Sequence, residues 1–371
     1  MLSRLRRGTA VAGLVLAAVL GTGSWAAADA QTPLTGPPPG AAAWVAEAVP
    51  GLRTPDPGTA SPTEVASFFR QLTPAQQDAL LLRHPQVVGN LDGAPTALRY
   101  RANALSLAAE LDRQRALADD AARPAHERAA AAALADRYRS LTGRQLLAFD
   151  PRGRGQVAEV FGDLAHDART AVVVPGADVD LGTYDKATAD GFDTLAGMAR
   201  SLRAASGDRV AVVAWVGYTT PLGIGVDVAR EELARAGAPR LDRLLAGLAP
   251  STGPVTVFCH SYGSVVCGLA KPDPRDVARL VVLASPGMSL DRAEELAVPV
   301  WAVRRNAEDW IADVPNVRLF GFGHGADPTA ADFRARPLPS TGSHGHSGYF
   351  APGSASLAAF AALALTGSPT A

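Results

Sequence analysis

The chain has 371 residues, of which 47% are hydrophobic and 19% charged. This composition is typical of a folded globular protein and excludes an intrinsically disordered one. The formal net charge is −1 at pH 7, which gives no broad electrostatic basis for binding nucleic acid or an anionic membrane. The length allows one large domain or two modest ones.

The first thirty residues have the pattern of a secretion signal. A positive n-region, supplied by Arg4, Arg6 and Arg7, precedes an apolar core over residues 10–20. The small residues "AAADA" then offer a cleavage site after Ala30. A membrane anchor is the alternative, but the apolar core is short and prolines follow it. No later stretch is long and apolar enough to span a bilayer, so we expect a secreted, extracellular protein.

A Pro/Gly-rich linker is predicted over residues 31–60 and a helical region over 61–144. Two capping boxes with proline at the first helical position, "SPTE" at Ser61 and "TPAQ" at Thr73, begin helices in this region. Further helices are predicted from Thr96 to about Ala118 and from Pro124 to about Leu141. We expect the helical region to pack on the remainder of the chain and to help shape its cleft.

From residue 145 to 371, short apolar runs rich in β-formers alternate with helical stretches. This alternation predicts an α/β fold with an eight-stranded, mostly parallel, doubly wound sheet. The predicted strands are 145–150, 156–162, 171–176, 209–218, 254–259, 280–285, 299–305 and 317–323. Only "PRGRG" separates the first two, which predicts an antiparallel hairpin at the sheet edge. Helices are predicted at 186–204, 228–248, 263–270 and 354–365.

Polar side chains follow several of these strands, at the sheet edge where reacting groups gather in such folds. Ser261 follows the fifth strand, Asp309 the seventh, and His344 and His346 the eighth. A serine hydroxyl is a poor nucleophile until a base takes its proton, and the imidazole needs an acid to orient it. The order Ser, Asp, His therefore predicts a nucleophile, an acid and a base on a nucleophile-elbow scaffold.

The turn around Ser261, "CHSYG", departs in one place from the usual elbow pattern. An elbow needs small residues two before and two after the serine, because strand and helix pass close together there. Gly263 meets the second requirement, whereas Cys259 only approximates the first. Cys267 lies two turns into the following helix. In an exported protein an even cysteine count favours a Cys259–Cys267 disulfide, and two buried free thiols are the alternative.

Acyl transfer also needs hydrogen-bond donors for the oxyanion. One is expected to be the backbone N–H of Tyr262, and the other to come from the loop after the third strand, at Gly176 or Ala177. The same loop carries three acidic residues that would suit calcium, Asp178, Asp180 and Asp185. Their spacing fits no EF-hand, and Asp185 suits the N-cap of the following helix. We therefore predict no metal and no cofactor.

The sequence resembles the α/β hydrolases, and more closely a secreted bacterial branch catalogued as α/β-hydrolase family 8. The matching stretches are "LTPAQQDALLLRHPQVVGNLDGAPTALRYRAN", "LLAFDPRGRGQVAEVFGDL", "VVVPGADVDLGTY", "HSYGS", "SPG" and "HSGYF". The resemblance implies serine-dependent ester or amide hydrolysis, with natural substrates largely undefined. The family pattern has glycine where this chain has Cys259.

The resemblance also bears on the base and the acid. The family's His-Ser-x-Tyr string falls on His346, which makes it the expected base and His344 the rival. An acidic residue followed by an apolar pair falls on Asp309, with the adjacent Glu308 as the alternative. Two further histidines are assigned lesser roles: His324 is expected to structure a turn or line the cleft, and His260 to pack or hydrogen-bond with its side chain turned away from Ser261.

Together these features predict a secreted serine hydrolase that acts on an ester or thioester through a Ser-His-Asp triad and an acyl-enzyme. The expected partner is a small-molecule or lipid-like ester, with no nucleic acid and no stable membrane span after signal cleavage. Two other interpretations stay open. One is an amidase or peptidase with the same triad, and the other is a non-enzymatic secreted binding scaffold.

Overall fold

The computed structural model describes residues 31–369, apart from residues 224, 315, 317 and 319–321. The predicted secretion signal, residues 1–30, lies outside the described residues. Among the described residues, none of the helices combines the length and the hydropathy needed to cross a bilayer.

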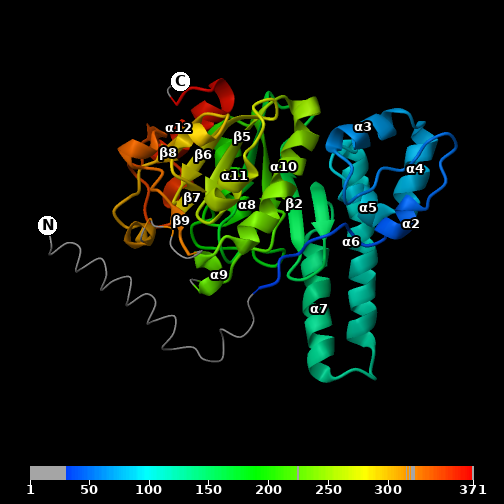
Figure 1. Cartoon of the computed structure of the whole chain (residues 1–371). Helices are drawn as coiled ribbons and strands as arrows, with labels where there is room; N and C mark the ends of the chain where they lie inside the picture. The colour runs from blue at the N-terminus through cyan, green and yellow to red at the C-terminus, as the bar shows by residue number, and fades with distance from the viewer. Residues whose placement is uncertain (1–30, 224, 315, 317, 319–321, 370–371) are drawn as a thin grey trace.

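An eight-stranded sheet forms the centre of the molecule, in the order β1-β2-β4-β3-β5-β6-β8-β10 (Figure 1). β2 pairs antiparallel with both of its neighbours, and every other pair is parallel. The predicted mostly parallel sheet and its edge hairpin are thus confirmed. Its strands are β1 (Leu146–Asp150), β2 (Gln156–Phe161), β3 (Arg169–Val174), β4 (Val210–Val216), β5 (Val255–His260), β6 (Val277–Leu283), β8 (Val300–Val303) and β10 (Arg336–Leu338). A separate two-stranded sheet pairs β7 (Gly287–Leu290) with β9 (His324–Gly325).

Helices cover both faces of the central sheet. One face packs against α8 (Leu195–Ala205) and α12 (Ala355–Thr366), and the other against α10 (Glu232–Thr252) and α11 (Gly263–Ala270). Successive strand residues point to opposite faces, so Val212 joins the first core and Val213 the second. This is why the central strands read as continuous apolar runs.

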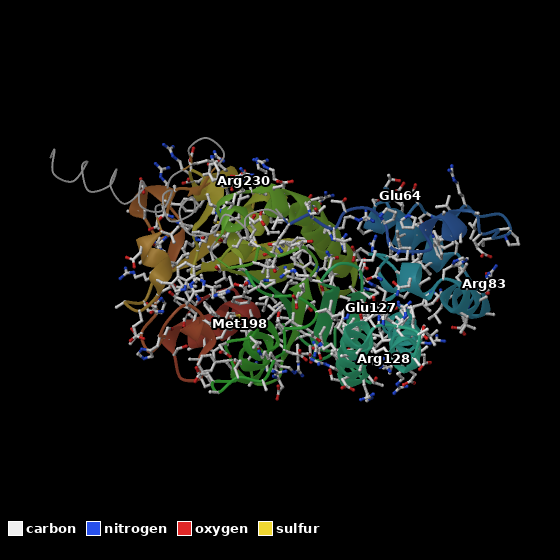
Figure 2. The ribbon with its side chains drawn as sticks, turned by 90° about the horizontal axis from the view of Figure 1, so that it is seen from below. Glu64, Arg83, Glu127, Arg128, Met198 and Arg230 are labelled. Carbon is white, nitrogen blue, oxygen red and sulfur yellow. A yellow bond between two sulfur atoms is a disulfide. The ribbon has the colours of Figure 1, made fainter. Side chains whose placement is uncertain are left out.

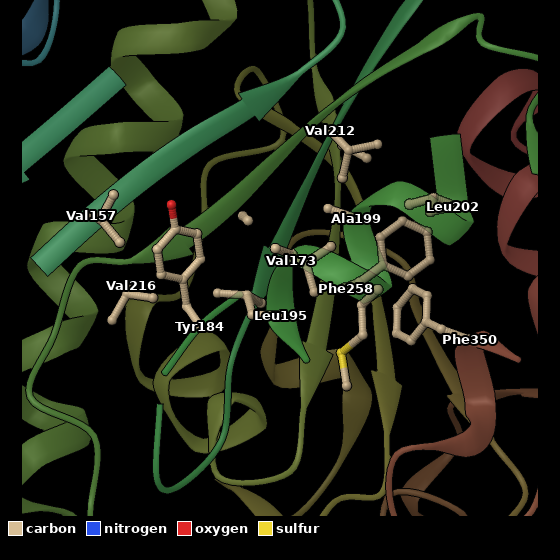
Figure 3. Close-up of a cluster of buried hydrophobic side chains, with 14 of the residues drawn as sticks. Val157, Val173, Tyr184, Leu195, Ala199, Leu202, Val212, Val216, Phe258 and Phe350 are labelled. Carbon is tan, nitrogen blue, oxygen red and sulfur yellow. The ribbon is translucent and has the colours of Figure 1, made fainter. Parts of the chain in front are cut away.

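The first of these cores gathers aromatic and branched side chains from several elements. Figure 3 shows Phe258 of β5 beside Phe350, with Val173 of β3 and Leu202 of α8 in the same cluster. The rings of Phe258 and Phe350 lie 6.1 Å apart in an edge-to-face arrangement. Because Phe258 lies three residues before Ser261, this packing fixes the end of β5 beneath the turn that carries the serine.

The N-terminal helices are α2 (Ala41–Val45), α3 (Pro62–Arg70), α4 (Pro74–Arg83), α5 (Pro85–Gly89), α6 (Thr96–Asp119) and α7 (Ala125–Ser140). Both predicted capping boxes, at Ser61 and Thr73, are present. Figure 1 shows α6 and α7 as a long pair that extends beyond the sheet. Figure 2 shows Glu64, Arg83, Glu127 and Arg128 on this helical part, apart from Met198 and Arg230.

The helical part is attached to the sheet edge through polar contacts as well as apolar ones. The side-chain amide of Asn90 donates to the carbonyl of Phe149 at 2.9 Å, and that of Asn103 donates to the carbonyl of Leu146 at 2.9 Å. Within the predicted linker, α2 places Trp44 fully buried among the N-terminal helices. Residues 31–60 therefore contribute to packing.

Three predicted elements differ from the structure. The helix predicted at 186–204 begins at Leu195, because the side chain of Thr194 caps it. The helix predicted at 228–248 is divided into α9 (Val226–Ala229) and α10. Most of the strand predicted at 317–323 lies outside the described residues, and the strand that pairs with β8 is β10. The described residues also form four short 3₁₀ helices: η1 (Ala293–Glu295), η2 (Trp310–Asp313), η3 (Ala331–Phe333) and η4 (Gly348–Phe350).

Candidate active site

Ser261 lies on a sharp turn between β5 and α11. Its φ is 52°, in the left-handed region that residues other than glycine rarely adopt. Such a conformation costs on the order of 1–3 kcal/mol and persists only where the surroundings enforce it. Here the backbone N–H of Ser261 donates to the carbonyl of Leu283 in the neighbouring strand at 3.0 Å. The strand–serine–helix turn has the conformation expected of a nucleophile elbow.

The two positions that flank Ser261 in the elbow differ in the side chain that they accept: position 263 requires glycine, whereas position 259 accommodates cysteine. A Cβ at Gly263 would lie 2.6 Å from the carbonyl oxygen of Pro175, so only glycine fits without backbone movement. Cys259 is fully buried and points into the core between β5 and α11. The disulfide predicted between Cys259 and Cys267 is present, with the two Cα atoms 6.4 Å apart. A cross-link closing so short a loop contributes on the order of 2–3 kcal/mol in the chain-entropy account.

The structure brings together the three residues predicted to act on the substrate. The imidazole Nε2 of His346 lies 2.9 Å from Ser261 Oγ, and its Nδ1 lies 2.7 Å from Asp309 Oδ1. Asp309 lies in the segment after β8 and is the N-cap of η2, and His346 lies shortly before η4. Ser261 and Asp309 are both buried. Three segments from distant parts of the chain thus form one hydrogen-bonded row.

Asp309 is held by more than the imidazole. Tyr349 Oη donates to its Oδ2 at 2.6 Å, and the backbone N–H of Ile311 donates to its Oδ1 at 3.1 Å. Burial acts to raise the pKa of Asp309, but the hydrogen bonds from His346 and Tyr349 outweigh it and hold the pKa below its ordinary value. The carboxyl group therefore stays ionised at neutral pH.

The residues considered as alternatives for the acid and the base do not join this row. Glu308 and His344 form their own pair at 3.1 Å, and both side chains are largely exposed. His324 is buried, lies 2.7 Å through Nε2 from the carbonyl oxygen of Val228, and packs edge-on against Tyr262. His324 therefore supports the second residue of the elbow and does not join the row of Asp309, His346 and Ser261.

Two of the predicted oxyanion donors, Gly176 and Tyr262, adjoin the serine. Gly176 is so close that a Cβ there would lie 2.6 Å from Ser261 Cβ and 2.9 Å from its Oγ. Ala177 is the next residue of the same loop, and Tyr262 directly precedes α11. The loop is fixed by Tyr218, whose Oη donates to the carbonyl of Pro175 at 2.7 Å. A substrate carbonyl placed at Ser261 would therefore lie between the backbone of the loop that carries Gly176 and the backbone of the turn that carries Tyr262.

The acidic residues of that loop have structural partners. Asp185 does not cap α8; it pairs with Arg137 of α7 at 2.6 Å and also with Arg144. Asp178 Oδ1 accepts from the backbone N–H of Gly223 at 2.7 Å. Among the described residues, no cluster of three or more metal-ligating side chains is found.

Two residues that the sequence does not assign to the site pack against the His346 ring. The ring centroid of Trp310 lies 4.5 Å from that of His346, and the residue is 46% exposed. His260 lies 5.0 Å away and its Nε2 donates to the backbone carbonyl of His346 at 3.0 Å. The apolar pair after Asp309 was the available signal for Trp310. Nothing in the sequence distinguished His260 from an ordinary core histidine.

The buried state of His260 has a measurable consequence. Burial, and then the neighbouring His346, lower its pKa from 6.5 to about 4. Between these two pH values the unfolded chain binds a proton that the folded protein does not bind. The neutral ring's contribution is therefore present above about pH 6.5 and is lost as the pH falls to 4, with an upper bound of about 3 kcal/mol.

We expect His260→Gln to flatten this pH dependence. The free energy of unfolding, measured by urea denaturation at pH 7.0, 5.5 and 4.5, should fall less steeply in the variant than in the parent protein. His126→Gln, at an exposed position of α7, is the control and should keep the parent's slope. Equal slopes for His260→Gln and the parent would contradict the assignment.

A mostly parallel eight-stranded sheet, with a serine on a sharp turn after its fifth strand, defines the α/β-hydrolase fold. Residues 150–319 match a family model described as "Alpha/beta hydrolase", which is α/β-hydrolase family 8. The predicted resemblance to this family is thereby confirmed, and the matched residues include Ser261 and Asp309.

The relatives found among curated proteins are uncharacterized. An uncharacterized protein of Mycobacterium tuberculosis is 29% identical over 248 residues, which is 57% of this chain and 37% of that protein. An uncharacterized protein of Mycobacterium bovis is 35% identical over 163 residues, which is 41% of this chain and 59% of that protein. The chain thus spans less than two thirds of the length of either relative.

The solved structures found are similar only at a low level. The esterase domain of a Rhodothermus marinus protein is 13% identical with a TM-score of 0.32, covering 58% of this chain and 91% of that one. A putative non-heme bromoperoxidase of Mycobacterium tuberculosis is 13% identical with a TM-score of 0.30, covering 53% and 90%.

Proposed function

We propose that the protein is a serine hydrolase that cleaves carboxylic esters or thioesters through an acyl-enzyme. The observation that carries the proposal is the row of Asp309, His346 and Ser261, joined at 2.7 Å and 2.9 Å on an elbow. In such a row the imidazole accepts the serine proton while the carboxylate holds the opposite ring nitrogen in its N–H form. General acid–base help of this kind contributes roughly 10²–10⁴ in rate.

The reaction proceeds in two halves on this geometry. Ser261 Oγ attacks the ester carbonyl as His346 Nε2 takes its proton, and the backbone N–H of Tyr262 with that of Gly176 or Ala177 stabilises the oxyanion. The imidazolium then donates the proton to the leaving alkoxide or thiolate. His346 next takes a proton from a water molecule, which attacks the acyl-enzyme; the bond from the acyl carbon to Ser261 Oγ then breaks, the imidazolium returns the proton to Oγ, and the acid leaves.

Exposed apolar side chains beside the row support an apolar, lipid-like substrate. Trp310 packs against His346 and is 46% exposed, and Leu222 is 51% exposed. Leu222 follows Pro221, whose carbonyl accepts from the backbone N–H of Asp178 in the oxyanion loop. Trp310 thus lies beside the triad candidates and Leu222 on a segment bonded to the oxyanion loop, and we expect both side chains to contact the substrate.

The contacts of Gln31 support export with cleavage after Ala30. Its backbone N–H donates to Asp227 Oδ2 at 3.0 Å, and its side-chain amide exchanges hydrogen bonds with the backbone at Thr220 and Leu222. Cleavage after Ala30 would turn that N–H into an ammonium beside a carboxylate, a favourable exchange at neutral pH. The proposed mature N-terminus would then fix the segment that contacts the oxyanion loop.

A fluorophosphonate probe together with a substrate panel tests the proposed function. We expect the protein to be labelled at Ser261, as located by peptide mass spectrometry, and to hydrolyse p-nitrophenyl acetate, butyrate and octanoate. The p-nitroanilide of the best acyl group should be cleaved much more slowly. Absence of both labelling and ester turnover would overturn the hydrolase proposal, and faster anilide cleavage would make the protein an amidase.

A further inference from the structure

A cavity of about 330 Å³ lies where the N-terminal helices meet the sheet edge. Its walls come from β1, β2, the end of β4 and α10, and residues 35–38 and 57–58 also line it. None of the three triad candidates or of the predicted oxyanion donors lines it. Its apolar lining includes Ala148, Trp215 and Leu244.

The charges that line this cavity do not balance. Four arginines and two aspartates lie on its walls: Arg99, Arg152, Arg240, Arg243, Asp92 and Asp150. Both carboxylates are already paired, Asp92 with Arg99 at 3.0 Å and Asp150 with Arg152 at 2.6 Å. Among the described residues, no carboxylate oxygen lies within 4.0 Å of a nitrogen of the other two arginines. The lining therefore carries two positive charges in excess.

Arg240 is the more deeply placed of those two residues. Its Nε donates to the carbonyl of Gly217 at 2.6 Å, and its Nη2 donates to Gln156 Oε1. Within the described part of the chain its remaining N–H groups have no acceptor. Burial lowers the pKa of Arg240, with Asp150 and Asp92 opposing it from a distance. A guanidinium in such surroundings gains from an anion placed beside it.

Gln156 provides the second, independent observation. The residue is only 4% exposed, and its Nε2 is buried without an acceptor among the described residues. Since its Oε1 accepts from Arg240, the amide and the guanidinium are adjacent. Unsatisfied buried donors are costly, and an acceptor placed in the cavity would satisfy this one. Hydrogen-bond donors without a partner, next to an excess of positive charge, are the groups that bind an oxyanion such as a carboxylate or phosphate.

We propose that this cavity binds a small organic carboxylate, with its oxygens at Arg240 and Gln156 and its apolar body against Trp215 and Leu244. The volume is within the range of small-molecule sites. Arginine presents parallel N–H groups that match a carboxylate in two-point geometry. A free phosphate ion could accept the same hydrogen bonds, but it has no apolar group to pack against Trp215 and Leu244. The apolar wall therefore favours an organic acid.

Isothermal titration calorimetry at constant ionic strength tests this site without any need for turnover. The ligands are acetate, benzoate, octanoate and inorganic phosphate, each added to the purified full chain. We expect benzoate or octanoate to bind more tightly than acetate and phosphate. Arg240→Gln should weaken that binding about 10–100-fold, because a charge-assisted hydrogen bond is lost. Gln156→Met should weaken it about 3–10-fold.

Arg235→Gln is the matched control, since Arg235 lies on the same helix, is exposed and does not line the cavity. It should bind the carboxylate as the parent protein does. Thermal unfolding of each variant shows that loss of binding is not loss of folding, and Gln156→Met serves where Arg240→Gln fails to fold. Three outcomes would overturn the proposal: no carboxylate bound by the parent protein, unchanged binding in both cavity variants, or phosphate bound as tightly as benzoate.

Discussion

Ser261→Ala is expected to lower kcat for the best p-nitrophenyl ester at least about 10⁴-fold, with little change in KM or in the free energy of unfolding. Removing the nucleophile abolishes the acyl-enzyme route and leaves only the contribution of oxyanion stabilisation and binding. Alanine keeps the Cβ and the backbone hydrogen bond to Leu283, so the strain at φ 52° is unchanged. The measurement is steady-state kinetics with fluorophosphonate labelling of the same preparations.

Ser347→Ala is the control for this experiment. Ser347 directly follows His346 in the chain, yet its hydroxyl makes no hydrogen bond to another described residue. Its replacement should leave kcat within about twofold, as for a side chain outside any network. If Ser261→Ala kept more than about one hundredth of the activity, or still took up the probe, the nucleophile would be another residue.

The predicted fold succeeded where the signal is local or periodic. Both capping boxes form because Ser61 and Thr73 each precede a proline and a residue that completes the box three positions later. The convergence of Ser261, Asp309 and His346 also followed from the sequence, because each comes after a strand whose carboxyl end lies at one edge of the sheet. The side-chain type then indicates the role of each residue: serine as the nucleophile, aspartate as the acid and histidine as the base.

The predicted elements differ from the structure where contacts between distant parts of the chain determine the local conformation. The last strand of the sheet is β10, three residues that include Pro337, and it is too short to give a pattern of its own. Asp185 suits a helix cap by type, but Arg137 and Arg144 approach it from another part of the chain and take both of its oxygens. The helix therefore begins later, at a residue that Thr194 can cap.

The side-chain contacts around His346 cannot be predicted from the sequence either. In the sequence Tyr349 is only part of a family string, whereas in the structure its hydroxyl donates a hydrogen bond to Asp309. His260 and Trp310 lie 86 and 36 residues from His346 in sequence, and neither residue type alone indicates packing on an imidazole. Sequence order places residues at an edge of a sheet, but the packing of their rings depends on side-chain geometry that no local pattern encodes.

The second large effect is expected at Asp309, where the sequence left Glu308 as an alternative. Asp309→Ala should lower kcat about 10⁴-fold, because the imidazole loses both the acceptor that fixes its N–H and the charge that stabilises the imidazolium. Glu308→Ala is the matched control and should stay within about twofold, since Glu308 is exposed and pairs with His344. Both are measured as kcat and kcat/KM on the same ester. Equal losses in the two variants would remove the assignment of the acid to Asp309.

Asp309→Asn separates orientation from charge at this position. The backbone N–H of Ile311 needs an acceptor at the Oδ1 position, so the amide oxygen is favoured there over the amide nitrogen. That oxygen would still accept from His346 Nδ1, and the productive tautomer would be kept while the negative charge is lost. We therefore expect a loss in kcat between those of Glu308→Ala and Asp309→Ala, on the order of 10²-fold. A loss as large as that of Asp309→Ala would mean that the amide turns its nitrogen toward the imidazole, and that Ile311 does not control its orientation.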